Sequence, residues 1–180
     1  MTSHREAEVH VVPYNVGWPA QFESERSLLL QVMRQYVSGP IEHIGSTAVP
    51  GLLAKPVIDI IVAVESLTAS RPALTLLEKV GYSSSSYRAD VMHWLCKPSP
   101  EVRTHHLHLV PFQSTLWVER IAFRDYLRKH PNAASEYADV KRQLAERFRF
   151  DREAYTDAKE PFVKQIVGFA LASERRASGK

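Results

Sequence analysis

A short apolar segment, residues 57–64, constrains the fold of this chain more than any other feature. Its sequence, VIDIIVAV, is almost continuously apolar and rich in β-branched residues. This composition is typical of a central strand that is buried on both faces. The only charged residue in the segment is Asp59. A lone carboxylate in a buried strand is costly without a partner, so we expect a lysine, a histidine or a metal ion beside it.

Hydrophobic periodicity predicts further strands and helices around this segment. Strands are expected at residues 8–14, 41–44, 82–88, 91–97 and 102–110. Helices are expected at residues 18–37, 70–80, 115–129, 132–148 and from about 156 onward, with Ser70 as the cap of the second. This order predicts an α+β fold, a mixed β-sheet with helices packed on it. We expect one domain over residues 1–180, with a sheet-rich core at about 1–112 and C-terminal helices at about 115–175.

Length and composition narrow the class of protein. A chain of 180 residues suits one domain. The single cysteine, Cys96, excludes an intrachain disulfide and fits a reducing cytoplasm. We expect no signal peptide and no membrane span, because no stretch approaches the roughly 20 apolar residues that a span needs. The net charge of +3 is too small to indicate a nucleic-acid partner.

The segment at residues 44–62, IGSTAVPGLLAKPVIDIIV, has the features of a phosphate-binding corner. Gly45 allows backbone N–H groups to approach a phosphate closely. Ser46 and Thr47 add hydroxyl donors. Asp59, on the following rigid strand, is suited to hold a divalent metal that bridges phosphates.

The stretch IGSTAVPGL followed by KPVID closely resembles the GrpB family. Similar segments follow in FRDYLRKHP at 123–131, EYADVK at 136–141 and YTDAK at 155–159, so the resemblance covers about residues 12–169. GrpB proteins are grouped with the nucleotidyltransferase superfamily, which uses a Gly-Ser turn followed by a strand with an Asp-x-Asp pair. The resemblance implies a nucleotidyltransferase-like fold and metal-dependent transfer from a nucleoside triphosphate to an unknown small-molecule acceptor.

One departure from the superfamily pattern keeps two functions open. Carboxylates two residues apart on a strand face the same way and share metal ions. Here the residue two positions after Asp59 is Ile61, so the second carboxylate is missing. The chain is therefore either an active nucleotidyltransferase that uses Mg or Mn, or a non-catalytic nucleotide- or metabolite-binding protein that kept the fold.

The segment at 102–110, VRTHHLHLV, supplies a second group of candidates. His106 and His108 share one face of this strand, and His105 points the other way. If the strand lies beside Asp59, both histidines are candidate metal ligands with it, and nitrogen ligands favour Mn, Zn or Ni over Mg. GrpB members have a similar His-x-His segment. A histidine-triad hydrolase is disfavoured because position 110 is Val. His43, with Glu42, is a weaker candidate for the same pocket.

Two lysines fall on apolar helix faces. Lys141 projects into the stripe of Tyr137, and Lys159 lies on the same face as Phe162. A lysine in a core-facing stripe needs an anion or a route to water, although its stem can also snorkel over the apolar surface. We expect both to reach phosphates bound at the Gly-Ser turn. Lys55, Lys141 and Lys159 are then candidates to neutralise the charge of leaving pyrophosphate.

Other conspicuous residues are assigned to structure. Arg124 and Asp125 are expected to form an ion pair. Cys96 has no catalytic context nearby, so we do not expect it to act as a nucleophile. The remaining aromatic candidates are expected in the core: Trp94, Trp117 and Phe123.

Overall fold

The computed structural model describes residues 8–178, which fold around one mixed sheet. The strand order across the sheet is β1-β2-β5-β4-β3. The central strands β2 and β5 are parallel, and the other neighbouring pairs are antiparallel. The strands span Ile41–Ile44 (β1), Ile58–Val64 (β2), Ser83–Ser85 (β3), His93–Pro98 (β4) and Arg103–Pro111 (β5).

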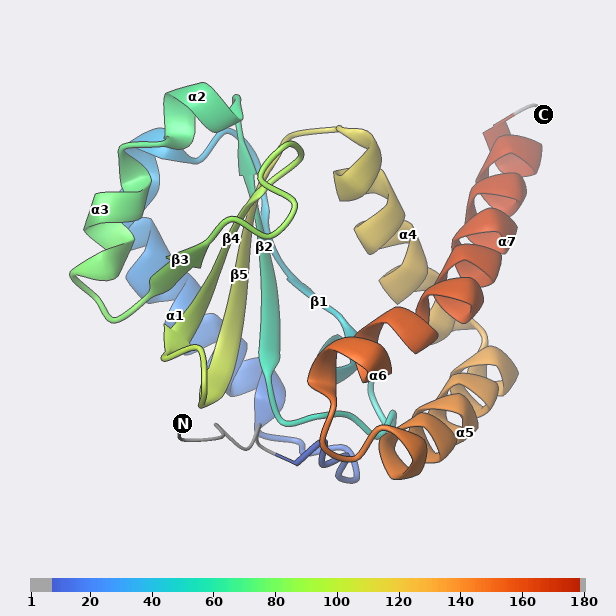
Figure 1. Ribbon diagram of the computed structural model, residues 1–180. Helices are drawn as coiled ribbons and strands as arrows, with labels where there is room; N and C mark the ends of the chain where they lie inside the picture. The colour runs from blue at the N-terminus through green and yellow to red at the C-terminus, as the bar shows by residue number, and fades with distance from the viewer. Residues whose placement is uncertain (1–7, 179–180) are drawn as a thin grey trace.

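Helices cover both faces of this sheet. Helices α1, α2 and α3 lie on one face, and α4 to α7 lie on the other (Figure 1). The α-helices span Trp18–Met33 (α1), Leu67–Ser70 (α2), Ala73–Glu78 (α3), Thr115–Lys129 (α4), Pro131–Arg147 (α5), Arg152–Ala158 (α6) and Glu160–Ser178 (α7). Two 3-10 turns, η1 at Arg34–Tyr36 and η2 at Ser46–Ala48, complete the helical elements. The expected mixed sheet with packed helices is confirmed.

Strand β2 is an interior strand of the sheet, between β1 and β5, as its apolar sequence predicts. Ile60 and Val62 are fully buried against the α1 side of the sheet. Ile61 and Ala63 are fully buried on the opposite side, where Trp117 of α4 packs. Because side chains alternate along a strand, Asp59 shares the α4 side with Ile61. The only charge of β2 therefore faces the helices of the C-terminal part.

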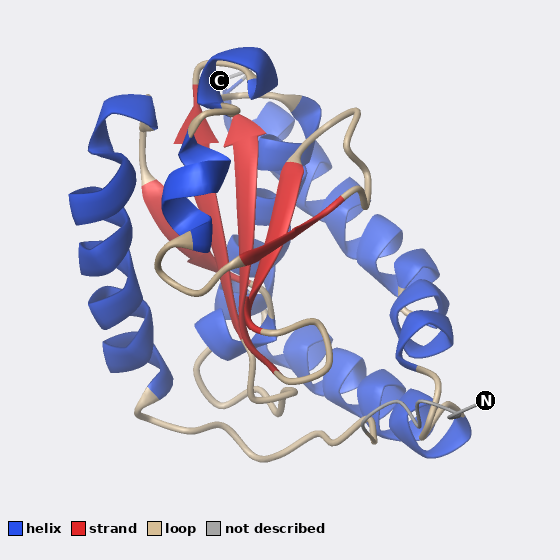
Figure 2. Cartoon of the chain, turned by 60° about the vertical axis from the view of Figure 1, so that its left-hand side comes forward, coloured by secondary structure: helices blue, strands red, loops and turns tan. Residues whose placement is uncertain are grey.

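The predicted strand at 8–14 is wrong. Only Val12 pairs, in an isolated bridge with Ala54, through N–O distances of 2.8 and 2.9 Å. The segment passes below the sheet from the C-terminal helices toward α1 instead of adding a strand (Figure 2). It is held at Val9, whose N–H donates to the Arg149 carbonyl at 2.8 Å. Pro13 has no N–H to donate, which disfavours a continuous ladder here.

Two predicted helix starts are also wrong. Ser66 rather than Ser70 caps the second helical region, because the Ser66 hydroxyl accepts from the Ala69 N–H at 3.1 Å. Ser70 lies one turn later, and the region is split into α2 and α3. Near the C-terminus, Asp151 caps an unexpected helix, α6, by accepting from the Ala154 N–H. The last helix then begins at Glu160.

The other predicted elements match within a few residues. The bounds expected at 41–44 and 115–129 are those of β1 and α4. No helix within residues 8–178 is both long enough and apolar enough to cross a membrane.

Candidate functional site

Asp59 and His106 form a hydrogen-bonded pair across the two central strands. The strand register places Asp59 between Ile44 of β1 and His106 of β5. The His106 Nδ1 lies 2.9 Å from Asp59 Oδ1, and the carboxylate accepts this hydrogen bond. The Asp59 side chain is 29% exposed, so it stays accessible from the α4 side. The partner that Asp59 needs is therefore a histidine, one of the three expected possibilities.

Gly45 lies directly against the same carboxylate. Its backbone has a φ of +71°, and a Cβ added there would lie 2.4 Å from Asp59 Oδ2. No other amino acid fits this position without displacing the acid. The Gly-Ser turn and Asp59 therefore lie side by side, and phosphate binding between them stays a prediction.

Lys141 reaches this turn from helix α5. Its side chain is buried, and Nζ donates hydrogen bonds to Ser46 Oγ at 3.0 Å and to the Leu53 carbonyl. The ammonium group also lies 4.6 Å from the centre of the Tyr137 ring. Burial, together with the charges of Lys159 and Arg142, lowers the pKa of Lys141 to about 7. The expectation that Lys141 reaches the Gly-Ser turn is confirmed.

Lys159 and Lys55 meet over one buried aromatic ring. Lys159, between α6 and α7, has its Nζ 4.2 Å from the centre of the Tyr155 ring, and the Nζ of Lys55 lies 5.4 Å from the same centre. Burial and the charge of Lys55 lower the pKa of Lys159 to about 8, whereas Asp59 opposes this shift. Lys159 therefore lies close enough to Asp59 for the two charges to interact, and Lys55 lies near Lys159.

The electrostatics of the site favour an anion. Burial raises the pKa of Asp59, but the hydrogen bond and charge of His106, with the charges of His108 and Lys159, outweigh it and lower the pKa to about 2. One ionised carboxylate therefore lies near Lys159, while Lys141 reaches the adjoining turn and Lys55 lies near Lys159. A ligand with several negative charges suits this balance better than a cation does.

Thr47 and His43 do not line the site. The Thr47 side chain is buried, and its hydroxyl contacts the Val57 carbonyl at 3.3 Å and His43 Nε2 at 2.9 Å. His43 lies on the α1 face, where its ring stacks on Phe22. The Thr47 hydroxyl is therefore engaged in contacts inside the protein and is not available as an exposed donor.

The expected metal ligands are not assembled. His108 lies on the same face as His106, but its Nδ1 lies 3.3 Å from Met92 Sδ, and burial lowers its pKa to about 3. Within residues 8–178 no group of three or more His, Cys, Asp or Glu side chains is arranged to hold a metal ion. Asp59, His106 and His108 thus do not form a preformed metal centre.

The residues assigned to structure mostly follow expectation. Arg124 Nε donates to Asp125 at 2.7 Å, which confirms the ion pair. Trp117 and Phe123 are buried, whereas Trp94 is only half-buried and lies against the His106 ring. Cys96 is buried, and burial raises the pKa of its thiol.

The sequence analysis missed Arg120 on helix α4. Its Nε is buried without a hydrogen-bond partner among the described residues, as is the Nε2 of His106. An arginine on an amphipathic helix carries no local sign of this environment, so no pattern singled it out.

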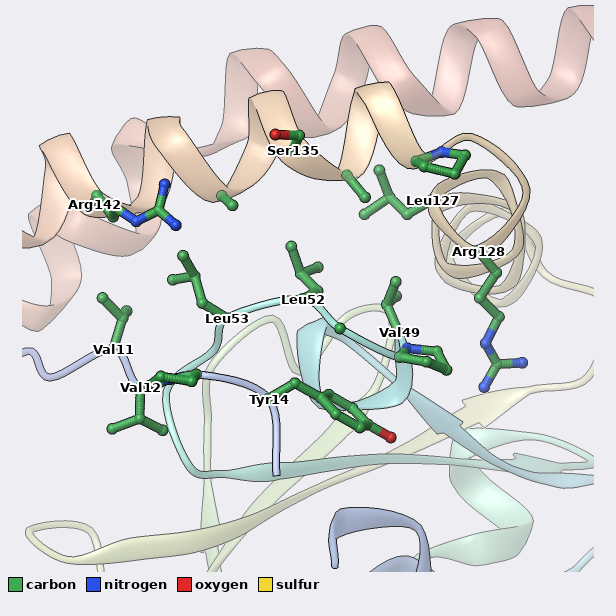
Figure 3. Close-up of a pocket in the computed structure, with 16 residues that line it drawn as sticks. Val11, Val12, Tyr14, Val49, Leu52, Leu53, Leu127, Arg128, Ser135 and Arg142 are labelled. Carbon is green, nitrogen blue, oxygen red and sulfur yellow. The ribbon is translucent and has the colours of Figure 1, made fainter. Parts of the chain in front are cut away.

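A cavity of about 880 Å³ lies on the other side of the loop that follows the Gly-Ser turn (Figure 3). The loop, α5 and the N-terminal segment wall it, with Leu52 and Leu53 facing in and Arg128 and Arg142 near its two ends. Asp59 is not part of the lining. The Leu53 side chain lines this cavity, whereas the Leu53 carbonyl accepts a hydrogen bond from Lys141.

Comparison with known proteins identifies relatives of this chain. A family model described as GrpB protein matches residues 8–168. The Glutamate-rich protein GrpB of Alkalihalophilus pseudofirmus is 36% identical over 172 residues, covering 93% of this chain and 98% of that protein. A crystal structure of conserved protein GrpB from Enterococcus faecalis has a TM-score of 0.83 at 35% identity, covering 92% of this chain and 99% of that one.

A more distant likeness concerns the fold alone. A crystal structure of the Cid1 poly(U) polymerase with bound MgGTP has a TM-score of 0.51 at 14% identity. The match covers 75% of this chain and 44% of that one.

Proposed function

This chain belongs to the GrpB family and has a nucleotidyltransferase-like fold, and from that premise we propose that it transfers a nucleotidyl group from a nucleoside triphosphate to a small-molecule acceptor. The observation that carries the proposal is the hydrogen bond from Lys141 to Ser46. It brings a buried cation onto the turn that touches Asp59. A lysine in that place is suited to a phosphate held at the turn.

The residues have distinct roles in the proposed reaction. Ser46 and Lys141 hold the phosphates at the Gly45 turn, and Lys55 and Lys159 offset the charge that develops on the leaving group. The acceptor oxygen attacks the α-phosphorus in line, the bond from that phosphorus to the bridging oxygen breaks, and pyrophosphate leaves. Positioning and charge stabilisation supply most of the rate in such transfers.

A divalent metal does not find a ready set of protein ligands here. Asp59 lies against the turn, and its Oδ1 already accepts a hydrogen bond from His106. We therefore derive no step through a metal. Mg or Mn is expected to arrive on the phosphates, which would supply most of its ligands. Zn or Ni would need His108 to turn away from Met92.

A thermal-shift screen of nucleoside triphosphates, crossed with Mg and Mn, tests the proposal. A ligand that binds only the folded protein stabilises it by about 2.7 kcal/mol at a hundredfold excess over Kd. We expect a shift that Asp59→Asn or Ser46→Ala reduces and that Asp90→Asn, an exposed control, leaves unchanged. The absence of any shift with either metal would contradict the proposal. Pyrophosphate release then measures turnover.

A second candidate function is binding without transfer. Ile61 replaces the second carboxylate, and one oxygen of Asp59 already accepts a hydrogen bond from His106. A protein of this kind shows the nucleotide-dependent thermal shift but releases no pyrophosphate with any acceptor. Loss of a measured transfer in a folded Asp59→Ala protein would exclude this alternative. The acceptor and the cytoplasmic location stay predictions.

A further inference from the structure

Arg120 of helix α4 is a half-buried cation whose Nε has no hydrogen-bond partner among the described residues. Its Nε is shielded from solvent and has no hydrogen-bond acceptor, and none of the described residues forms an ion pair with its guanidinium. The arginine side chain stays charged under all ordinary conditions. Leaving a buried donor of a charged group unsatisfied costs more than leaving a neutral one. The position therefore calls for an acceptor that the described residues do not supply.

The neighbours of Arg120 place it at the candidate site. Burial is the main cause of the pKa shifts of His108, Tyr137 and Lys159, and the Arg120 charge lowers the pKa of each. These three groups belong to β5, to α5 and to the junction of α6 and α7. Arg120 thus faces the region where the sheet and the C-terminal helices meet. This is the region that holds Asp59 and Lys141.

Arg124, one turn further along α4, has a structural role and serves as a comparison for Arg120. It donates to Asp125 at 2.7 Å, to Glu42 at 2.6 Å and to the His43 carbonyl at 3.0 Å. These contacts tie α4 to β1. Arg120 forms no such hydrogen bond or ion pair within residues 8–178, so ion pairing gives no reason for its presence.

We propose that Arg120 binds the phosphate chain of the nucleotide and selects ligands with several phosphate groups. The inference rests on the proposed function. A guanidinium presents a planar fork of donors that matches phosphate oxygens in pairs. Lysines reach the same region from α5 and from the α6–α7 junction, so the site draws cations from three elements. Such a distribution suits an extended tri- or diphosphate better than a single phosphate.

Binding of inorganic tripolyphosphate and of a nucleoside triphosphate to the full chain, measured by calorimetry, tests this role. We expect Arg120→Met to weaken both ligands by about tenfold to a hundredfold, and Arg120→Lys to weaken them less. Inorganic monophosphate should bind weakly to every variant. Arg71→Met, at an exposed arginine, is the control and should bind like the wild type.

The stability of the ligand-free variants separates binding from a structural role. Arg120→Met should keep or raise the melting temperature, because no described contact is lost and repulsion with Lys159 falls. Arg124→Met should lower it. A fall in Arg120→Met as large as that in Arg124→Met would overturn the inference. If the wild type binds both ligands and Arg120→Met binds them with the same affinity, the inference is also overturned. The proposed function would then still stand. A wild type that binds neither ligand would refute the proposed function and the inference together.

Discussion

Lys141 Nζ donates a hydrogen bond to Ser46 Oγ over 3.0 Å, although 95 positions separate the two residues in the chain. This contact joins the helical C-terminal part to the Gly-Ser turn of the sheet. It also places a buried amine, with a pKa lowered to about 7, where a phosphate is expected.

The buried amine predicts how stability depends on pH. Its pKa is about 7 in the folded chain and 10.5 as the ordinary value, so between these pH values the unfolded chain binds more protons. The free energy of unfolding should therefore rise with pH from about 7 to 10. The penalty of the buried charge is fully present below pH 7. This one group contributes at most about 1.4 kcal/mol per pH unit.

Urea unfolding of the wild type and of Lys141→Met at pH 7, 8 and 9 checks this prediction. The difference between the two proteins isolates Lys141, because Lys159 and the other titrating groups are common to both. The wild type should gain stability relative to the variant as pH rises. If the free energy of unfolding changed with pH in the same way in both proteins, burial would not be lowering the pKa of Lys141.

Gly45→Ala should be among the most destabilising single changes in the chain. The new methyl group would lie 2.4 Å from the Asp59 carboxylate, on a backbone with a φ of +71°. Gly51→Ala is a matched control, because its φ is +78° but nothing lies within 4 Å of the added atom. We expect a loss of about 1–2 kcal/mol for Gly51→Ala, from the backbone alone, and a clearly larger loss for Gly45→Ala.

Denaturant unfolding of these two variants and of the double variant Gly45→Ala with Asp59→Gly checks the contact. Removing the carboxylate should recover part of the loss, as a non-additive pair. Equal losses for both glycines would show that the turn is not packed against Asp59.

Removal of the His106 ring should raise the pKa of Asp59. In the wild type, burial raises this pKa, while the hydrogen bond and charge of His106 help to lower it to about 2. In His106→Ala the burial remains and the hydrogen bond is lost. NMR titration of the Asp59 carboxyl carbon measures the change, with exposed His10→Ala as the control. If the pKa of Asp59 were the same in His106→Ala as in the wild type, the hydrogen bond between Asp59 and His106 would be excluded.

Lys159→Met should slow pyrophosphate release by tenfold or more if the proposed transfer occurs. The lysine amine lies over the Tyr155 ring, and its charge lowers the pKa of Asp59. A group that offsets charge developing on the leaving phosphate acts on the transition state, so kcat should fall more than affinity. Lys129→Met, at an exposed position of α4, serves as the comparison. If Lys159→Met released pyrophosphate as fast as Lys129→Met, Lys159 would have no role in the reaction.

Several features of the site follow from local sequence patterns. The β-branched run at 57–64 predicts the central strand, and the helical spacing of Tyr137 and Lys141 predicts a lysine on a core-facing stripe. Gly45 and Asp59 are recognisable because the turn and the strand are close in the chain. These features depend on residues a few positions apart, where backbone geometry alone sets the relationship.

The three-dimensional packing decided the rest. His108 and His106 share a strand face, but the His108 ring contacts Met92, which precedes β4, and the His106 ring is hydrogen-bonded to Asp59. Arg120 and Arg124 look alike in the sequence, and Glu42, far away in the chain, makes one of them structural.

Local sequence is enough to predict the central strand, the Gly-Ser turn and the apolar faces of the long helices, because these depend on hydrophobic period and on neighbouring residues. Which side chains face the site, and which of them are already paired, was decided only when distant elements came into contact. Hydrogen bonds and burial act through space and take no account of separation along the chain.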